Sequence, residues 1–424
     1  MKDNFRVHGY DSSIGFAALT FRPASENSTL VDILLAAGAV LYCKTNVPQT
    51  LGQLDTHNNI FGRTINPYNR SATVGGSSGG EGALIAMRGS VLGVGTDVGG
   101  SIRIPAMCNG LYGIKPSWQR VPFAGLQGAS LPGISQLSVS ASAGPIATTL
   151  RDCETFLRIV SDQKPWELDP AVVFGSWDTQ GDISKPPLIG IVRTDGLIEP
   201  LSPIARLLDE VVSTLRSSGI EVVEMDITQE FSKCQSLLNA FLGVDGGNYV
   251  FDLLESAEEP LSPWLSSRVK RRKPMTLEQV RDLHKKRSDL ETQFLKVWKT
   301  NDGRSIDAFI CPIAPHPTPP IDRWNGVSYT STFVLLDYPA GAIPIRKFRS
   351  HDNNGDIPDT KPLSSWDRVN RELWTQVDRG TYLNTPMGIQ VVVPKLQERR
   401  LCQAMKLVDD AIKASGRKGQ LAKL

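Results

Sequence analysis

Two segments rich in glycine and serine carry the residues of this chain that are best suited to chemistry. Residues 75–80 read GGSSGG and lead into a helix-forming run over residues 81–87, and residues 93–101 end in GGS. Backbone N–H groups at a helix start or in a glycine turn can hold a negatively charged atom. A serine beside such groups predicts nucleophilic catalysis, in which the N–H groups stabilise an oxyanion.

Two other interpretations of these segments have to be weighed. A phosphate-binding loop needs GxGxxG, or GxxxxGK followed by Ser or Thr, and neither spacing is present, because Gly95 is followed by Gly99 and Gly80 by Glu81. Purely structural glycine loops are the default for a single run of this kind. Two serine-bearing loops close together in the chain favour a hydrolytic site instead.

The base for such a serine is not a histidine in an evident motif. His57 is the nearest one, but its Thr-His-Asn-Asn stretch is typical of a polar turn, so a lysine has to be considered. A lysine takes a proton from serine only when burial or nearby positive charge disfavours its ammonium form. We therefore expect a buried lysine that is neutral at rest.

The elements that must position these loops alternate between helix and strand. Apolar periodicity and capping residues predict helices over residues 27–38, 202–217, 277–299 and 398–414, the third with Thr276 and Gln279 spaced as a capping box. Short apolar runs predict strands over residues 40–43, 188–192, 220–225, 308–311, 342–345 and 389–393. This alternation indicates an α/β fold. Since no linker-like stretch divides the chain, we expect residues 1–424 to form a single domain.

Composition excludes several classes of function. The 424 residues carry 46 Lys and Arg against 44 Asp and Glu, a net charge of +2, which disfavours binding to nucleic acid or to an anionic membrane surface. The basic residues 270–273 and 285–287 favour a solvated helix face over a nuclear localisation patch. The longest apolar run, residues 30–43, is too short to cross a bilayer, and the first residues lack the apolar region of a secretory signal. A cytoplasmic protein without a membrane segment is the expectation.

Cysteine and histidine usage gives no support for a metal site. The six cysteines are scattered without CxxC spacing, and the five histidines form no HxH or HxxxH pair. We interpret the cysteines as reduced, because a chain of this length does not need disulfides for its stability.

Several sequence motifs together resemble the amidase signature family of serine hydrolases. They are GGSSGGEGALI (75–85), GTDVGGSIRIP (95–105), GLYGIKPS (110–117), KTNVPQ (44–49) and NPYN (66–69), and the signature core covers about residues 2–120. Weaker similarity continues to the C-terminal region, and YTSTFVLLDYPAGAIPI (329–345) looks most like the fungal acetamidase-like branch. The resemblance implies the amidase signature fold, with a large mixed central sheet covered by helices on both faces.

The resemblance also implies a catalytic set of two serines and a lysine. Ser101 matches the nucleophile, Ser77 matches a bridging serine that shuttles the proton, and a cis peptide bond is expected between Gly76 and Ser77. Lys2, in MKDN, matches the catalytic base, whereas Lys44 belongs to a different motif of the family. The expected reaction is hydrolysis of a carboxylic amide to a carboxylate and an amine or ammonia, and it needs no cofactor and no metal.

Further residues are expected to support this set. The backbone N–H groups of Val98, Gly99, Gly100 and Ser101 match the oxyanion hole. Gly76, Ser78 and Thr96 would hold the catalytic groups in place. Asp97 and Arg103 are expected to form a charged pair that braces the loop, and an ordinary exposed pair is the alternative.

The resemblance leaves the substrate and the assembly open. Short aliphatic, aryl and fatty acyl amides all occur as substrates in the family, and a homodimer is a possible assembly. Residues 49–54 and 331–338 are pocket candidates, with ordinary core packing as the alternative. Members of the family carry a substantial segment before the catalytic lysine, so we expect the N-terminal portion to be missing here. A truncated, catalytically impaired protein that acts as a binding scaffold or is a non-functional fragment is therefore the alternative.

Overall fold

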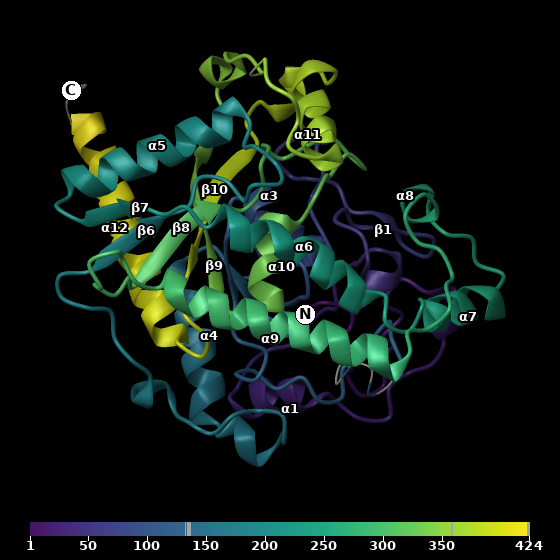
Figure 1. The fold of residues 1–424 in the computed structure, drawn as a ribbon. Helices are drawn as coiled ribbons and strands as arrows, with labels where there is room; N and C mark the ends of the chain where they lie inside the picture. Colours follow the sequence, from purple (N-terminus) through teal and green to yellow (C-terminus); the bar gives the residue numbers. More distant parts are fainter. Residues whose placement is uncertain (132, 134–136, 358, 422–424) are drawn as a thin grey trace.

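The computed structural model describes residues 1–131, 133, 137–357 and 359–421, and its central feature is an eight-stranded mixed sheet (Figure 1). In spatial order the strands are β3 (Leu92–Asp97), β5 (Ser142–Ala147), β4 (Tyr112–Lys115), β9 (Ala340–Lys347), β10 (Pro386–Val392), β8 (Ala308–Pro312), β6 (Leu188–Ile191) and β7 (Glu221–Glu224). A separate small hairpin pairs β1 (His57–Asn58) with β2 (Gly62–Arg63).

The two halves of the sheet differ in strand direction. From β3 to β8 each neighbouring pair is antiparallel, whereas β8, β6 and β7 run parallel to one another. Parallel neighbours need a crossover connection, and α5 (Ser202–Ser217) supplies it between β6 and β7. The predicted strand, helix and strand over residues 188–225 are thereby confirmed.

Helices cover both faces of the sheet. One face packs against α4 (Leu150–Asp162), α5 and α12 (Glu398–Leu421). The other face packs against α2 (Gly79–Ala86) and α3 (Arg103–Cys108), with α10 (Ser328–Leu335), α6 (Thr228–Leu242) and α9 (Leu277–Val297) next to them. The remaining α-helices of the described residues are α1 (Thr29–Ala36), α7 (Asn248–Ser256), α8 (Pro263–Ser266) and α11 (Ser365–Thr375). The expected mixed sheet with helices on both faces is confirmed.

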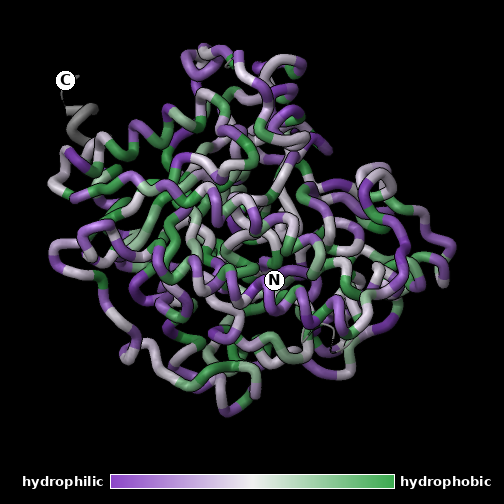
Figure 2. Tube along the Cα trace, in the orientation of Figure 1, coloured by the Kyte–Doolittle hydropathy of each residue, from purple (hydrophilic) through white to green (hydrophobic). Residues whose placement is uncertain are grey.

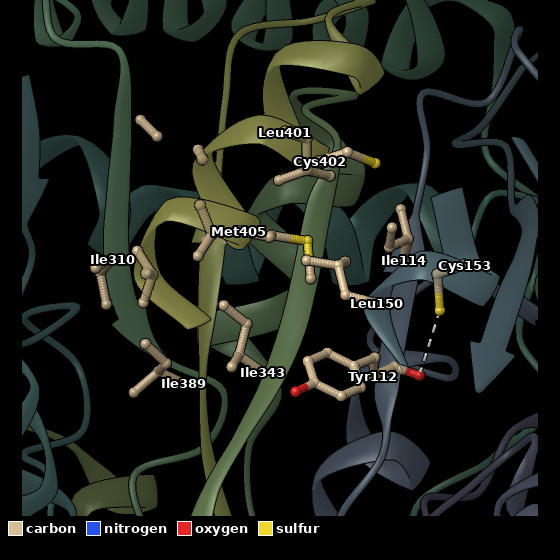
Figure 3. Close-up of a cluster of buried hydrophobic side chains, with 14 of the residues drawn as sticks. Tyr112, Ile114, Leu150, Cys153, Ile310, Ile343, Ile389, Leu401, Cys402 and Met405 are labelled. Carbon is tan, nitrogen blue, oxygen red and sulfur yellow. Dashed lines mark hydrogen bonds between the residues drawn. The ribbon is translucent and has the colours of Figure 1, made fainter. Parts of the chain in front are cut away.

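The largest apolar core lies between the sheet and α12. Figure 3 shows Leu401, Cys402 and Met405 of α12 above Ile343 of β9 and Ile389 of β10, all of them buried. Successive strand residues alternate between the faces, so Ile343 belongs to this core while its neighbour Ala342 belongs to the core around α3. Hydrophobic residues accordingly concentrate in the middle of the molecule (Figure 2).

Gly341 of β9 lets α12 approach this closely. A Cβ atom at Gly341 would lie 2.1 Å from the Met405 sulfur, which is well inside contact distance. A side chain at this strand position would therefore require the flexible Met405 side chain to move.

Two local predictions from the sequence are wrong. Residues 40–43 form no strand, and Val40 and Tyr42 have exposed side chains. A strand needs a hydrogen-bonded partner, and the pairing found nearby is an isolated bridge between Lys2 and Thr45. Residues 270–273 lie in an exposed segment before α9 and not on a helix face. By contrast, Lys285 and Arg287 do lie on α9, and the predicted capping box at its start is present.

Candidate active site

The Lys2 side chain is buried against the start of α2 and the end of β3. Its Nζ donates to Ser77 Oγ at 2.8 Å, to Thr96 Oγ1 at 2.8 Å and to the Thr96 carbonyl oxygen at 3.2 Å. The Lys2 backbone is held as well, because its N–H donates to the Val94 carbonyl oxygen of β3 at 3.1 Å. Lysine and serine from distant parts of the sequence are thus in direct contact.

Burial changes the acidity of this lysine. Lys2 is 1% exposed, and desolvation lowers its pKa from 10.5 to about 7, although the carboxylates of Asp97 and Glu81 act in the opposite direction. A substantial fraction of Lys2 is therefore neutral near pH 7. This is the protonation state in which its nitrogen can accept a proton.

Ser77 and Ser78 lie where the chain enters α2. The peptide bond between Gly76 and Ser77 is cis, as the resemblance implies. Both serine side chains are buried, and the Ser78 amide donates to the Ser101 carbonyl oxygen at 3.3 Å. Ser78 Oγ also donates to the Thr96 carbonyl oxygen at 3.4 Å. These contacts join the two glycine-serine segments in space.

Ser101 lies in the turn between β3 and α3. Within the described part of the chain its hydroxyl makes no hydrogen bond, so Ser77 Oγ and Ser101 Oγ are not directly bonded to each other here. Catalytic hydrogen bonds are often loose without substrate and tighten in the reacting complex. The backbone contact between Ser78 and Ser101 keeps the two hydroxyls on neighbouring segments.

The amides around Ser101 differ in what they bind. Those of Val98, Gly99 and Ser101 donate to no acceptor among the described residues. The Gly100 amide, which was predicted to belong to the oxyanion hole, instead donates to Asp97 Oδ1 at 2.7 Å. The Gly100 N–H therefore already has an acceptor, whereas the N–H groups of Val98, Gly99 and Ser101 have none within the described ranges.

Asp97 and Arg103 form a buried, bidentate ion pair. Arg103 Nε and Nη2 each lie 3.0 Å from an Asp97 carboxylate oxygen, and both side chains are 0% exposed. The alternative of an exposed pair is therefore wrong. Burial alone would raise the pKa of Asp97, but the charge and hydrogen bonds of Arg103, together with the Lys115 charge and the Ile102 N–H, lower this pKa overall. Arg103 also donates to Gln390 Oε1 and to the Thr330 carbonyl oxygen.

Lys44 and His57, which the sequence does not favour as the base, lie outside the group around Lys2. Lys44 contacts Asp3, at 3.1 Å, and Ser12, and it makes no contact with Ser77. His57 belongs to the β1–β2 hairpin. In the described ranges of the chain, no group of three or more His, Cys, Asp or Glu side chains is arranged to hold a metal ion.

Of the two candidate pocket segments, residues 49–54 contact the segment before Ser77, whereas Phe333 to Leu336 and Tyr338 lie in a buried apolar cluster, as the core-packing alternative expects. Within residues 49–54, the Gln53 carbonyl oxygen lies 2.6 Å from where a Cβ of Gly76 would be. Residues 331–335 are part of α10, and Thr330, just before them, donates its hydroxyl to the Gly99 carbonyl oxygen at 2.6 Å. No pattern in the sequence indicated this contact of Thr330, because it joins residues that are 231 positions apart.

The helices of the described residues include none that is both long and apolar enough to cross a membrane. This finding concerns residues 1–131, 133, 137–357 and 359–421.

Comparison with known proteins gives concordant results. A family model described as Amidase matches residues 1–402. An amidase of Gibberella zeae is 33% identical over 98% of this chain and 77% of its own length. An acetamidase of Emericella nidulans is 33% identical over 94% of this chain and 74% of its own length. Among solved structures, a fatty acid amide hydrolase superposes with a TM-score of 0.86 at 28% identity, over 97% of this chain and 72% of that chain.

Proposed function

Because the chain belongs to the amidase family, we propose that it hydrolyses a carboxylic amide to a carboxylate and an amine or ammonia through an acyl-enzyme on Ser101. The observation that carries this proposal is the contact between Lys2 and Ser77, in which Nζ lies 2.8 Å from Oγ inside a buried environment. A neutral lysine next to a buried serine suits proton transfer and has no evident use in a purely structural contact.

In the proposed first step, Lys2 draws a proton from Ser77 while Ser77 draws one from Ser101. A neutral Lys2 can donate its two hydrogens to the Thr96 carbonyl oxygen and to Thr96 Oγ1, so that its lone pair faces Ser77. Ser101 Oγ then attacks the amide carbon, and Lys2 ends as the ammonium. The negative charge that develops on the substrate oxygen would be received by the amides of Val98, Gly99 and Ser101.

In the later steps, protons move along the same path, first from Lys2 to the leaving nitrogen and then from water back toward Lys2. The proton on Lys2 returns through Ser77 to the leaving nitrogen as the C–N bond breaks, which leaves an ester on Ser101. A water molecule then attacks this ester, gives its proton to the same path and releases the carboxylate. Ser101 regains its hydrogen, so the cycle needs only protein groups and water.

The length of the acyl group is the open variable of this proposal. Two of the relatives are named acetamidase and fatty acid amide hydrolase. Hydrolysis rates over a series of amides from acetamide to a long-chain fatty acid amide would measure the preferred length.

Covalent labelling tests the proposed function directly. A fluorophosphonate should attach to Ser101, and peptide mapping should find the label there. The Ser101→Ala variant should take no label and hydrolyse no amide, with the same thermal unfolding curve as the wild type. A folded wild-type protein that takes no label and turns over no amide would instead support the binding scaffold.

A further inference from the structure

We propose that Thr330 is a positioning residue that holds the oxyanion loop, residues 98–101, in its active geometry; this rests on the proposed function. Thr330 lies on α10, far from the loop in sequence. Its hydroxyl donates to the Gly99 carbonyl oxygen at 2.6 Å, and its second acceptor, the Val327 carbonyl oxygen, is farther away at 3.1 Å. The shorter of these bonds is the one that reaches the loop.

The contact fixes one particular peptide group. The carbonyl oxygen of Gly99 and the N–H of Gly100 belong to the same planar unit. Thr330 holds this unit at the oxygen, and Asp97 Oδ1 holds it at the nitrogen at 2.7 Å. With both ends held, the plane cannot rotate. The flanking amides of Gly99 and Ser101 therefore keep their directions, and neither donates to a described residue.

The two anchors are connected to each other. Arg103 Nη2 donates to Asp97 Oδ1 at 3.0 Å and to the carbonyl oxygen of Thr330 itself at 2.8 Å. The path from Gly99 through Thr330, Arg103 and Asp97 back to Gly100 is a closed ring of hydrogen bonds. All four contacts are buried or nearly so, hence water does not compete for them strongly.

Thr330 also lies against the loop sterically. A Cβ atom at Gly100 would be 2.5 Å from Thr330 Oγ1, so the helix and the loop touch at this point. Gly100 has a φ of 130°, which favours glycine, and the turn therefore depends on a residue without a side chain here. The Thr330 hydroxyl is the side-chain group through which α10 forms a hydrogen bond with this turn.

The test compares two substitutions of Thr330 with a matched control. Thr330→Val keeps the shape and removes the hydroxyl, whereas Thr330→Ser keeps the hydroxyl. Thr385→Val is the control, since Thr385 is equally buried and also donates to a carbonyl oxygen at 2.6 Å, that of Tyr382. It precedes β10 at the end of the sheet away from Ser101.

Thr330→Val should lower kcat by about 10- to 100-fold with KM nearly unchanged, a loss somewhat below that for removing an oxyanion donor outright. Its affinity for a trifluoromethyl ketone, whose adduct with Ser101 carries the oxyanion, should fall by a similar factor. Thr330→Ser should stay within about threefold of the wild type, as should Thr385→Val.

Equal losses of kcat in Thr330→Val and Thr385→Val would overturn the proposal, and so would a loss in Thr330→Ser as large as that in Thr330→Val. A wild-type protein that takes no fluorophosphonate label would overturn both this inference and the proposed function. A labelled wild type with an unaffected Thr330→Val variant would overturn this inference alone.

Discussion

The amino group of Lys2 lies 2.8 Å from the hydroxyl oxygen of Ser77, in surroundings that leave the lysine 1% exposed. Thr96 supplies the two other acceptors of this amino group, so every hydrogen of the ammonium form has a partner. Desolvation nevertheless brings the Lys2 pKa down to about 7. The contact therefore joins a serine to a base that can change its charge near neutral pH.

Hydrolysis should depend on pH in the direction that this pKa sets. Protonated Lys2 cannot accept the Ser77 proton, so kcat/KM should rise with pH through about 7 and level off above it. Well below this pKa, the rate should change about tenfold per pH unit. The labelling rate of Ser101 by a fluorophosphonate, measured over the same range, should follow the same curve. A flat profile between pH 5.5 and 8 would argue against Lys2 as the base.

Replacing each lysine in turn tests the assignment of Lys2, and not Lys44, as the base. Lys2→Met should lower kcat by about 100- to 10,000-fold, the usual range for removing a general base, because methionine fills the space but accepts no proton. Lys44→Met should retain most of the activity, because Lys44 pairs with Asp3 and does not contact Ser77. Steady-state kinetics on both purified variants decides the question, and the opposite ranking of the two would contradict the assignment.

The sequence predicts much of the fold because local signals coincide with tertiary requirements. The apolar period of residues 202–217 and the capping residues of α9 are local, and both helices form where they are expected. Residues 40–43 are apolar too, but a strand depends on a neighbouring chain to pair with, and no local pattern reports that neighbour. Residues 270–273 differ for another reason, because a run of basic residues does not distinguish a solvated helix from an exposed loop.

The predictions for the site also separate into those that rest on local patterns and those that depend on the folded structure. Motif resemblance places Lys2, Ser77 and Ser101 because each lies in a stretch with its own pattern. Whether the Gly100 amide is available depends on how the Asp97 carboxylate turns back toward it, which is a three-dimensional fact. The contact of Thr330 with Gly99 has the same character, because two segments meet only after folding.

The buried ion pair of Asp97 and Arg103 should contribute strongly to stability. Arg103→Met leaves the Asp97 carboxylate buried without its partner, which typically costs about 3–5 kcal/mol of unfolding free energy. Arg103→Lys should also destabilise the protein, because an ammonium cannot reproduce the bidentate contact. Equilibrium unfolding in urea measures both effects. Lys285→Met removes an exposed pair with Asp289 on α9 and should leave the unfolding midpoint unchanged.

Substitution by alanine should affect stability differently at two glycines near the nucleophile. At Gly76 a Cβ would lie 2.6 Å from the Gln53 carbonyl oxygen and 2.9 Å from the Asp55 nitrogen, both backbone atoms. Because the backbone must shift, Gly76→Ala should lose about 1–3 kcal/mol of stability. At Gly99 a Cβ would meet no described atom within 4 Å, and φ there lies outside the left-handed region. Gly99→Ala should therefore unfold at the wild-type temperature.

Although Gly99→Ala should keep its stability, it should lose activity. The open space in front of Gly99 adjoins the free amides of Val98, Gly99 and Ser101, where the proposed oxyanion would bind. A methyl group in that space should exclude the substrate carbonyl and lower kcat/KM by at least about tenfold, because a misplacement of 1 Å can already cost more. Thermal unfolding and kcat/KM measured on the same preparations test both statements together. Full hydrolysis by Gly99→Ala would mean that the substrate approaches Ser101 from another side.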